Sequence, residues 1–140
     1  MGVTTTGLNA IASLIAGAGV WNDFDDKTTG SGNAYLGVGD SGGSMVGFSA
    51  AQNTLIGTTN TKWKQCDSVA VTNNSIVFVA TFAAGDAVFE WRENGIFNGS
   101  GSQTFGTAPY AMLTRASEDL INKTSDEVVV FTKTLVISSS

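Results

Sequence analysis

The chain has 140 residues, a length that fits one domain and allows a sizeable core without disulfide or metal staples. Charged residues make up only 14% of the sequence, so Ser, Thr, Asn and Gly must solvate much of the surface. Such a surface can pack against another protein without stripping water from many ions. The net charge of −5, with only seven Lys and Arg, argues against nucleic acid as a partner, because basic side chains make most phosphate contacts.

Residues 1–19 are predicted to form an N-terminal arm and a short helix. The apolar residues at helical spacing are Leu8, Ile11, Ala12 and Ile15. A Thr cap opens the helix, which we expect over residues 5–16, and Gly17 gives a stop signal. The apolar stretch 8–18 is too short to cross a bilayer and lacks the basic flank of a signal peptide. We therefore expect no membrane partner and synthesis in the cytoplasm.

Residues 20–61 are rich in Gly, Ser, Asn and Asp and are predicted to be mostly loop, with one short apolar run at 34–38 that could be a strand. Loops of this length are uncommon in compact domains unless they are functional. Trp21 and Phe24, in the early part of this loop, are the aromatic residues that we expect to be exposed, and the N-terminal arm is a second candidate for attachment. The expected partner-contact residues are Val3, Thr4, Trp21 and Phe24.

Residues 62–140 are predicted to form an antiparallel β core. Its β-type runs are 63–72, 75–83, 87–92, 110–117 and 127–138. Asn73 and Asn74 give a two-residue hairpin signal between the first two runs, since Asn tolerates a positive φ. The predicted fold is one mainly β domain: an antiparallel β-sandwich or flattened barrel with one short N-terminal α-helix.

Aromatic side chains should fill the space between the two sheets of such a domain. The expected members of this layer are Phe78, Phe82, Phe89, Phe97 and Phe131. Cys66 is the single cysteine, so an intrachain disulfide is impossible, and we expect it to be a small buried hydrophobe.

Two glycine-rich strings look like catalytic or cofactor motifs. Residues 39–43 spell GDSGG, as around the nucleophile of trypsin-like proteases, but that chemistry needs a histidine and the chain has none. Residues 37–42 match the GxGxxG pattern of dinucleotide sites, but no helical period follows to place a helix N-terminus at the phosphates. We therefore predict neither catalytic nor cofactor-binding residues.

The acidic residues do not indicate a metal site or a catalytic carboxylate pair either. Three aspartates between residues 23 and 26 lack the spacing of an EF-hand, so a solvated loop is expected rather than a metal site. Glu90 and Glu93 lie three apart, which on a strand without a bulge places them on opposite faces. A salt bridge from Arg92 or Arg115 to one of them is expected instead. The chain is accordingly predicted not to be an enzyme.

Several segments share an ordered pattern with a known group of proteins. They are residues 1–4, 7–12, 33–41, 48–57, 89–98, 112–115 and 123–124. In this order they resemble small structural proteins of tailed-bacteriophage and prophage genomes, a family of capsid decoration or tail-fibre-like β-domains. The sequence departs from the pattern at 42–48 and 100–109, so contacts made there would be its own.

The resemblance implies a structural protein of the virion, made in the host cytoplasm. We expect a stand-alone capsid decoration, or cement, protein that binds the major capsid protein on the outside of the head, as a homotrimer. The alternative is a tail-fibre, baseplate or neck component that binds tail proteins. An alternative of another class is a carbohydrate-binding module with Trp21, Trp63 or Trp91 as stacking platforms.

Overall fold

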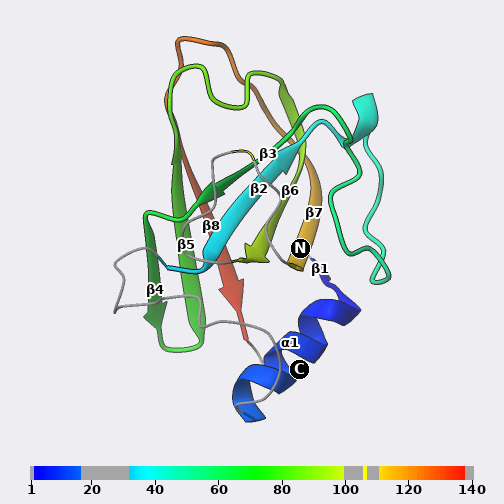
Figure 1. The fold of residues 1–140 in the computed structure, drawn as a ribbon, viewed down its shortest axis with the longest axis vertical. Helices are drawn as coiled ribbons and strands as arrows, with labels where there is room; N and C mark the ends of the chain where they lie inside the picture. Colours follow the sequence, from blue (N-terminus) through cyan, green and yellow to red (C-terminus); the bar gives the residue numbers. More distant parts are fainter. Residues whose placement is uncertain (1, 17–31, 100–105, 107–110, 138–140) are drawn as a thin grey trace.

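The computed structural model describes residues 2–16, 32–99, 106 and 111–137 of the chain (Figure 1). The described part consists of strands, one α-helix and a short 3-10 helix. In chain order the elements are β1 (Gly2–Val3), α1 (Thr5–Ala16), β2 (Ala34–Gly39), η1 (Ser41–Gly43), β3 (Thr61–Gln65), β4 (Ser68–Thr72), β5 (Ser75–Phe82), β6 (Glu90–Asn98), β7 (Ala111–Asn122) and β8 (Val129–Val136).

The strands form two antiparallel sheets that pack as a sandwich and do not close into a barrel. The large sheet has the order β1-β7-β6-β2-β3 and the small sheet the order β4-β5-β8. Strand β2 confirms the short strand predicted at 34–38. It is buried at every position and pairs with β3 and β6, so the core includes part of the region expected to be mostly loop.

The single strand predicted over 63–72 is in fact two strands, β3 and β4, which belong to different sheets. The backbone N–H of Cys66 still donates to Ala34 O of the large sheet at 2.9 Å, whereas the next N–H, of Asp67, donates to Val79 O of the small sheet at 2.7 Å. The chain thus crosses between sheets within one residue. Cys66 is half-buried against the core, and burial together with the Asp67 charge raises the pKa of its thiol to about 12.

The hairpin predicted at Asn73 and Asn74 is confirmed. Thr72 lies opposite Ser75, which leaves two residues in the turn, and Asn73 has a φ of 55°. Asn accepts this left-handed conformation at low cost, because its short polar side chain can bond the local backbone. Local turn chemistry therefore sets the register of β4 on β5.

Helix α1 confirms the predicted range. Hydrogen bonds at its N-terminus join it to β7 of the large sheet. Thr4 Oγ1 accepts from Gly7 N at 2.9 Å, the bond of a helix N-cap, and donates to Met112 O of β7 at 3.1 Å. Thr4 N also donates to Leu113 O at 3.1 Å. One threonine thus begins the helix and ties it to the strand.

The face of α1 that meets the sheet differs from the predicted apolar stripe. Leu8 is 58% exposed, whereas Gly7 is buried and Ile11 packs against the core. A Cβ at Gly7 would lie 2.3 Å from Leu113 O, so only glycine permits the helix to approach β7 this closely. Gly17 and the side chains of Ala12 and Ile15 lie outside the described residues.

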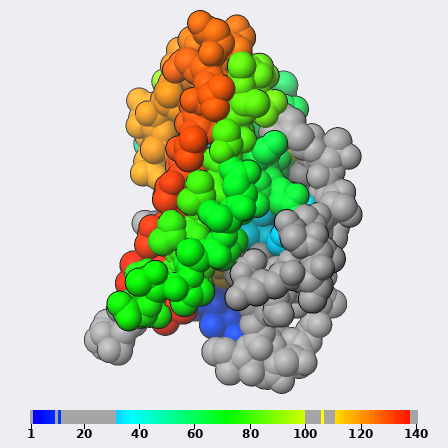
Figure 2. Space-filling model, turned by 90° about the vertical axis from the view of Figure 1, so that its left-hand side faces the viewer, coloured from blue at the N-terminus to red at the C-terminus, as the bar shows by residue number. Residues whose placement is uncertain are grey.

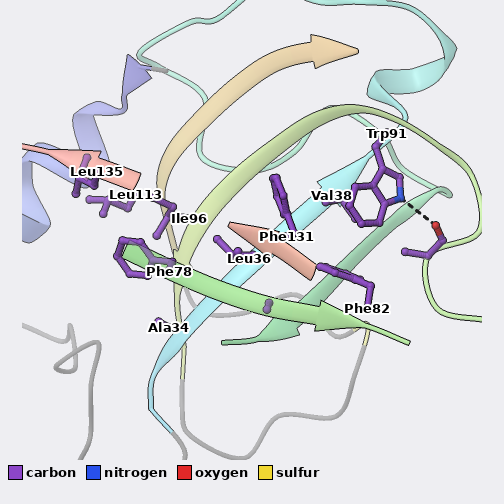
Figure 3. Packing of buried hydrophobic residues seen from close by; sticks show 12 residues of the cluster. Ala34, Leu36, Val38, Phe78, Phe82, Trp91, Ile96, Leu113, Phe131 and Leu135 are labelled. Atoms are coloured by element: carbon purple, nitrogen blue, oxygen red, sulfur yellow. Dashed lines mark hydrogen bonds between the residues drawn. The ribbon is translucent and has the colours of Figure 1, made fainter. Parts of the chain in front are cut away.

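Aromatic and aliphatic side chains fill the space between the sheets (Figure 3). Trp91 is at the centre of the aromatic group, with its ring centroid 4.9 Å from that of Phe82 and 5.7 Å from that of Phe131. Its indole Nε1 donates to Ala87 O at 2.9 Å. Of the predicted layer, Phe78, Phe82 and Phe131 are in this core, and Phe89 packs at its border.

Phe97 was expected in the same layer, and that expectation is wrong. It belongs to a second buried cluster, which the described residues Tyr35, Leu55, Trp63, Phe97 and Met112 form. Consecutive strand residues point to opposite faces, and its neighbour Ile96 occupies the inter-sheet core. Phe97 consequently packs on the other face of the large sheet, where its ring meets that of Trp63 edge to face at 6.0 Å.

Candidate contact surface

The outward face of the small sheet is built entirely from small and β-branched uncharged side chains. Phe78, Ala80 and Phe82 of β5 are fully buried in the core, so the alternate residues of that strand point away from it. The strand register then fixes the remaining members of this face. We call it the outer sheet face, and its residues are Ser68, Ala70, Thr72, Ser75, Val77, Val79, Thr81, Val130, Thr132, Thr134 and Val136.

The outer sheet face is accessible along much of its length. Figure 2 shows its three strands, in green and orange-red, side by side on one side of the molecule. Val130 is 63% exposed and Val136 54% exposed. A charged side chain lies at the edge of this face, where Asp67 accepts a hydrogen bond from Thr81 Oγ1 at 2.6 Å. Exposed apolar surface of this kind, bordered by polar groups, is typical of protein contact sites.

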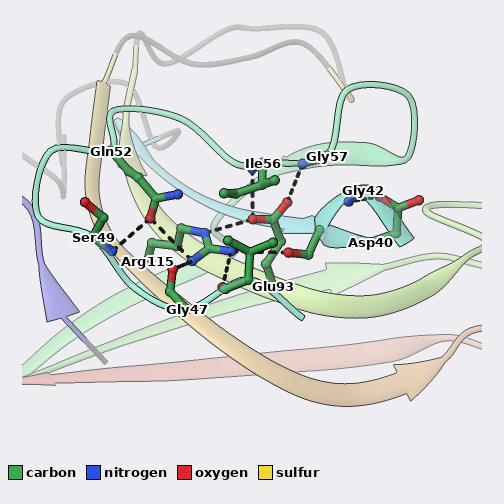
Figure 4. Close-up of polar contacts among 11 residues, drawn as sticks. Asp40, Gly42, Gly47, Ser49, Gln52, Ile56, Gly57, Glu93 and Arg115 are labelled. Carbon is green, nitrogen blue, oxygen red and sulfur yellow. Dashed lines mark hydrogen bonds and ion pairs between the residues drawn. The ribbon is translucent and has the colours of Figure 1, made fainter. Parts of the chain in front are cut away.

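A buried ion pair holds the long loop 44–60 against the opposite sheet (Figure 4). Arg115 Nε donates to Glu93 Oε2 at 2.9 Å, and both side chains are fully buried. The Glu93 carboxylate also accepts from Ile56 N at 2.9 Å and Gly57 N at 2.8 Å. The arginine donates to the carbonyls of Val46 and Gly47. The pair is therefore structural, since its donors and acceptors are used to fix backbone.

The predicted pairing of the acidic residues in β6 is confirmed. Arg92 pairs with Glu90 at a half-exposed position, and Arg115 pairs with Glu93 in the interior. The structure thus separates the two carboxylates into different ion pairs. Among the described residues, no group of three or more His, Cys, Asp or Glu is placed to hold a metal ion.

The GDSGG string at 39–43 forms a tight turn that buries its serine. Ser41, Gly42 and Gly43 all have positive φ values, and Asp40 Oδ1 accepts from Gly42 N at 2.9 Å. Ser41 is 1% exposed, and its hydroxyl lies 3.4 Å from Arg115 Nη2 as an acceptor. A buried serine hydroxyl beside a guanidinium has no general base to activate it.

The expected partner-contact residues have different positions in the structure. Thr4 is fully buried and its hydroxyl is bonded internally, so in this conformation it is not available to a partner. Val3 is half-buried and packs at the border of the core. Trp21 and Phe24 lie outside the described residues, as do the three aspartates at 23–26. The outer sheet face was missed because it depends on strand register, which individual runs of Val and Thr do not reveal.

The aromatic platforms expected of a sugar-binding module are only partly testable. Trp91 is 1% exposed and Trp63 is 9% exposed, and both rings pack in buried clusters. A stacking platform must present its ring face to the ligand. Trp63 and Trp91 therefore do not serve this role in the described conformation.

A polar bridge joins the two sheets beside β8. Glu118 Oε1 accepts from Lys133 Nζ at 2.9 Å and from Asn94 Nδ2 at 2.7 Å. Burial alone would raise the pKa of Glu118, but these two hydrogen bonds and the Lys133 charge outweigh it, so the pKa lies below its ordinary value. The bridge thus favours the ionised carboxylate.

This bridge predicts a dependence of stability on acid. Because the pKa of Glu118 is lower in the folded state, its contribution is present above the unfolded pKa and is lost as the pH falls through the folded pKa. We expect Lys133→Met to flatten the fall in unfolding free energy between about pH 5 and pH 3, measured by urea titration. Glu118→Gln should flatten it similarly, and a wild-type slope in both variants would contradict the assignment.

No family model matches the sequence, and no curated protein matches it either. No helix in the described part of the chain is long and apolar enough to cross a bilayer. The sequence resemblance, the fold and the chemistry of the surfaces are therefore the basis for a functional proposal.

Proposed function

We propose that this protein is a structural component of a tailed-bacteriophage virion that attaches to the outside of the head as a decoration protein. Its proposed partner is the major capsid protein, and its proposed attachment surface is the outer sheet face. The sequence resemblance supports the virion setting. The single observation that supports the surface is the uncharged Val, Thr, Ser and Ala composition of the outer sheet face across three strands.

The physical argument rests on the cost of removing water. Each charged group that a partner covers must be paired or lose hydration energy, whereas Val and Ala gain from burial and Thr and Ser can bond a partner's backbone. Pairing in the sheet already fixes the backbone of this face, so little conformational entropy is lost on attachment. Many copies on a symmetric shell can then reinforce it although each contact is modest.

Co-sedimentation with purified, expanded empty capsids tests the proposal. Val79 lies at the middle of the outer sheet face on its central strand, and Val88 is 45% exposed outside that face. We expect Val79→Lys to weaken capsid binding by at least about tenfold, since it places an unpaired charge in the contact, and Val88→Lys to leave it within about twofold. Thermal melting of both variants checks that the fold is intact.

Two results would contradict the proposal. Wild-type protein that stays in the supernatant with capsids but pellets with purified tails would favour the tail or neck alternative. A Val79→Lys variant that binds capsids as tightly as wild type would show that attachment uses another surface, such as the region of Trp21 and Phe24.

A further inference from the structure

We propose that two copies of the chain associate edge to edge through β8, antiparallel across a two-fold axis at Thr132. The two small sheets would then form one continuous sheet. This association does not depend on what the protein attaches to, and it differs from the trimer that the family resemblance implies.

Strand β8 presents a long free edge. It is eight residues long and pairs with β5 on one side, and no strand in the described part of the chain pairs with its other side. Ile137 N donates to Asn74 O at 2.9 Å, so the odd-numbered residues of β8 direct their backbone groups toward β5. Val130, Thr132 and Thr134 must therefore direct theirs outward, ready to accept another strand.

Side-chain chemistry selects one register for the pair. With the axis at Thr132, that residue faces its own copy, Val130 of one chain faces Thr134 of the other, and about six backbone hydrogen bonds form. Lys133 then lies opposite Phe131 of the other copy, a pairing without charge conflict. Moving the axis to Lys133 would place two lysines directly opposite each other, which is destabilising.

Charge explains why this edge suits a second copy. Each chain carries a net charge of −5, so two copies repel unless they meet where acidic groups are few. Strand β8 has no acidic residue, and its one charge, on Lys133, is turned inward and paired with Glu118 at 2.9 Å. An inward lysine usually discourages edge pairing, but here the ion pair already compensates it.

The other edge of the small sheet is a poorer template. Strand β4 has only five residues and directly follows the exposed Asp67, and a charged residue at the end of an edge strand discourages pairing. Short edge strands also offer few backbone bonds. Pairing through β8 leaves the outer sheet face of each copy uncovered, so the pair would present one continuous uncharged face of twice the width.

Sedimentation velocity of the full chain from about 1 µM to about 1 mM tests the association, because a single strand pair is a small interface and should give a weak, concentration-dependent complex. We expect the mass to rise from 14.4 kDa toward twice that value. Thr132→Lys should raise the dissociation constant by at least about tenfold, since two lysines would meet at the axis. Thr72→Lys, the same change on β4, should leave it within about twofold.

Amide hydrogen exchange gives a readout that is specific to the edge. The amides of Val130, Thr132 and Thr134 should become protected as concentration rises, whereas those of Phe131 and Lys133 should be protected at every concentration. A monomer throughout the range would overturn the proposal, as would a trimer. An association that Val79→Lys abolishes and Thr132→Lys leaves unchanged would also overturn it, since it would show face-to-face stacking.

Discussion

Replacing Arg115 with alanine should lower the free energy of unfolding by about 3–5 kcal/mol, because it leaves the fully buried Glu93 carboxylate without its counter-ion. The backbone donors at Ile56 and Gly57 would still bind this carboxylate, but they do not neutralise its charge. The carbonyls of Val46 and Gly47 would lose a donor at the same time. Urea denaturation monitored by tryptophan fluorescence measures the loss.

Strand β6, which carries Glu93, supplies a matched control for this prediction. Arg92 forms the half-exposed ion pair with Glu90, and pairs of that kind contribute about 0–1 kcal/mol. Arg92→Ala should therefore cost less than about 1 kcal/mol. The double variant Arg115→Met with Glu93→Leu should cost less than the sum of the single changes, because removing both charges removes the desolvation penalty. Equal losses for Arg115→Ala and Arg92→Ala would contradict the structural role given to the buried pair.

Trp91→Ala should destabilise the fold by a similar amount, about 3–5 kcal/mol, because it leaves a large cavity in the inter-sheet core. The ring contacts with Phe82 and Phe131 disappear, and Ala87 O loses the indole donor. Trp91→Phe is the informative control. It keeps an aromatic ring in the same place and mainly loses the hydrogen bond, so we expect a loss of about 1–2 kcal/mol.

The outcome for Trp91 also tests the sandwich arrangement. The three aromatic side chains come from β5, β6 and β8, so the cavity left by Trp91→Ala lies between the two sheets. Chemical denaturation curves of the two variants give the difference in their unfolding free energies directly, provided that their m-values are equal. A Trp91→Ala variant as stable as Trp91→Phe would mean that this layer contributes little to holding the sheets together.

Local signals in the sequence predicted α1 and the β4–β5 hairpin, whereas the run predicted at 87–92 covers only the first three residues of β6. The two asparagines at 73 and 74 favour a turn wherever they occur, and a Thr followed by an apolar helical period favours a helix start. The range of α1 and the β4–β5 hairpin follow from such short-range chemistry. The mainly β class and the antiparallel sandwich follow from the number of β-type runs and the turns between them.

Long-range arrangement was harder to predict. A run of β-type residues cannot show that the chain changes sheets at Cys66 and Asp67, because both sides of the crossing have the same propensity. Phe97 was assigned to the wrong layer, because hydrophobicity alone does not distinguish the two buried faces of the large sheet. The outer sheet face becomes visible only once the register of three strands is known.

The ion pairs, too, were predicted only in part from the sequence. The expected salt bridges from Arg92 and Arg115 form, but the opposite faces expected for Glu90 and Glu93 assumed unbroken alternation, which the irregularity between Trp91 and Glu93 interrupts. The sequence did not reveal that only one of the two pairs is buried, nor that it holds loop 44–60. The register places Ser117 opposite Glu93, next to an irregularity in the pairing of β6 with β7. Sequence alone does not reveal such an irregularity.

The proposed role of the protein is that of a surface contact domain on a phage head. A density map of intact virions of a phage whose genome encodes this sequence tests that role most directly. The proposal predicts density for the sandwich on the outer surface of the capsid, with the outer sheet face of β4, β5 and β8 against the shell. Density for the sandwich on the tail, or on the head with this face toward solvent, would contradict it.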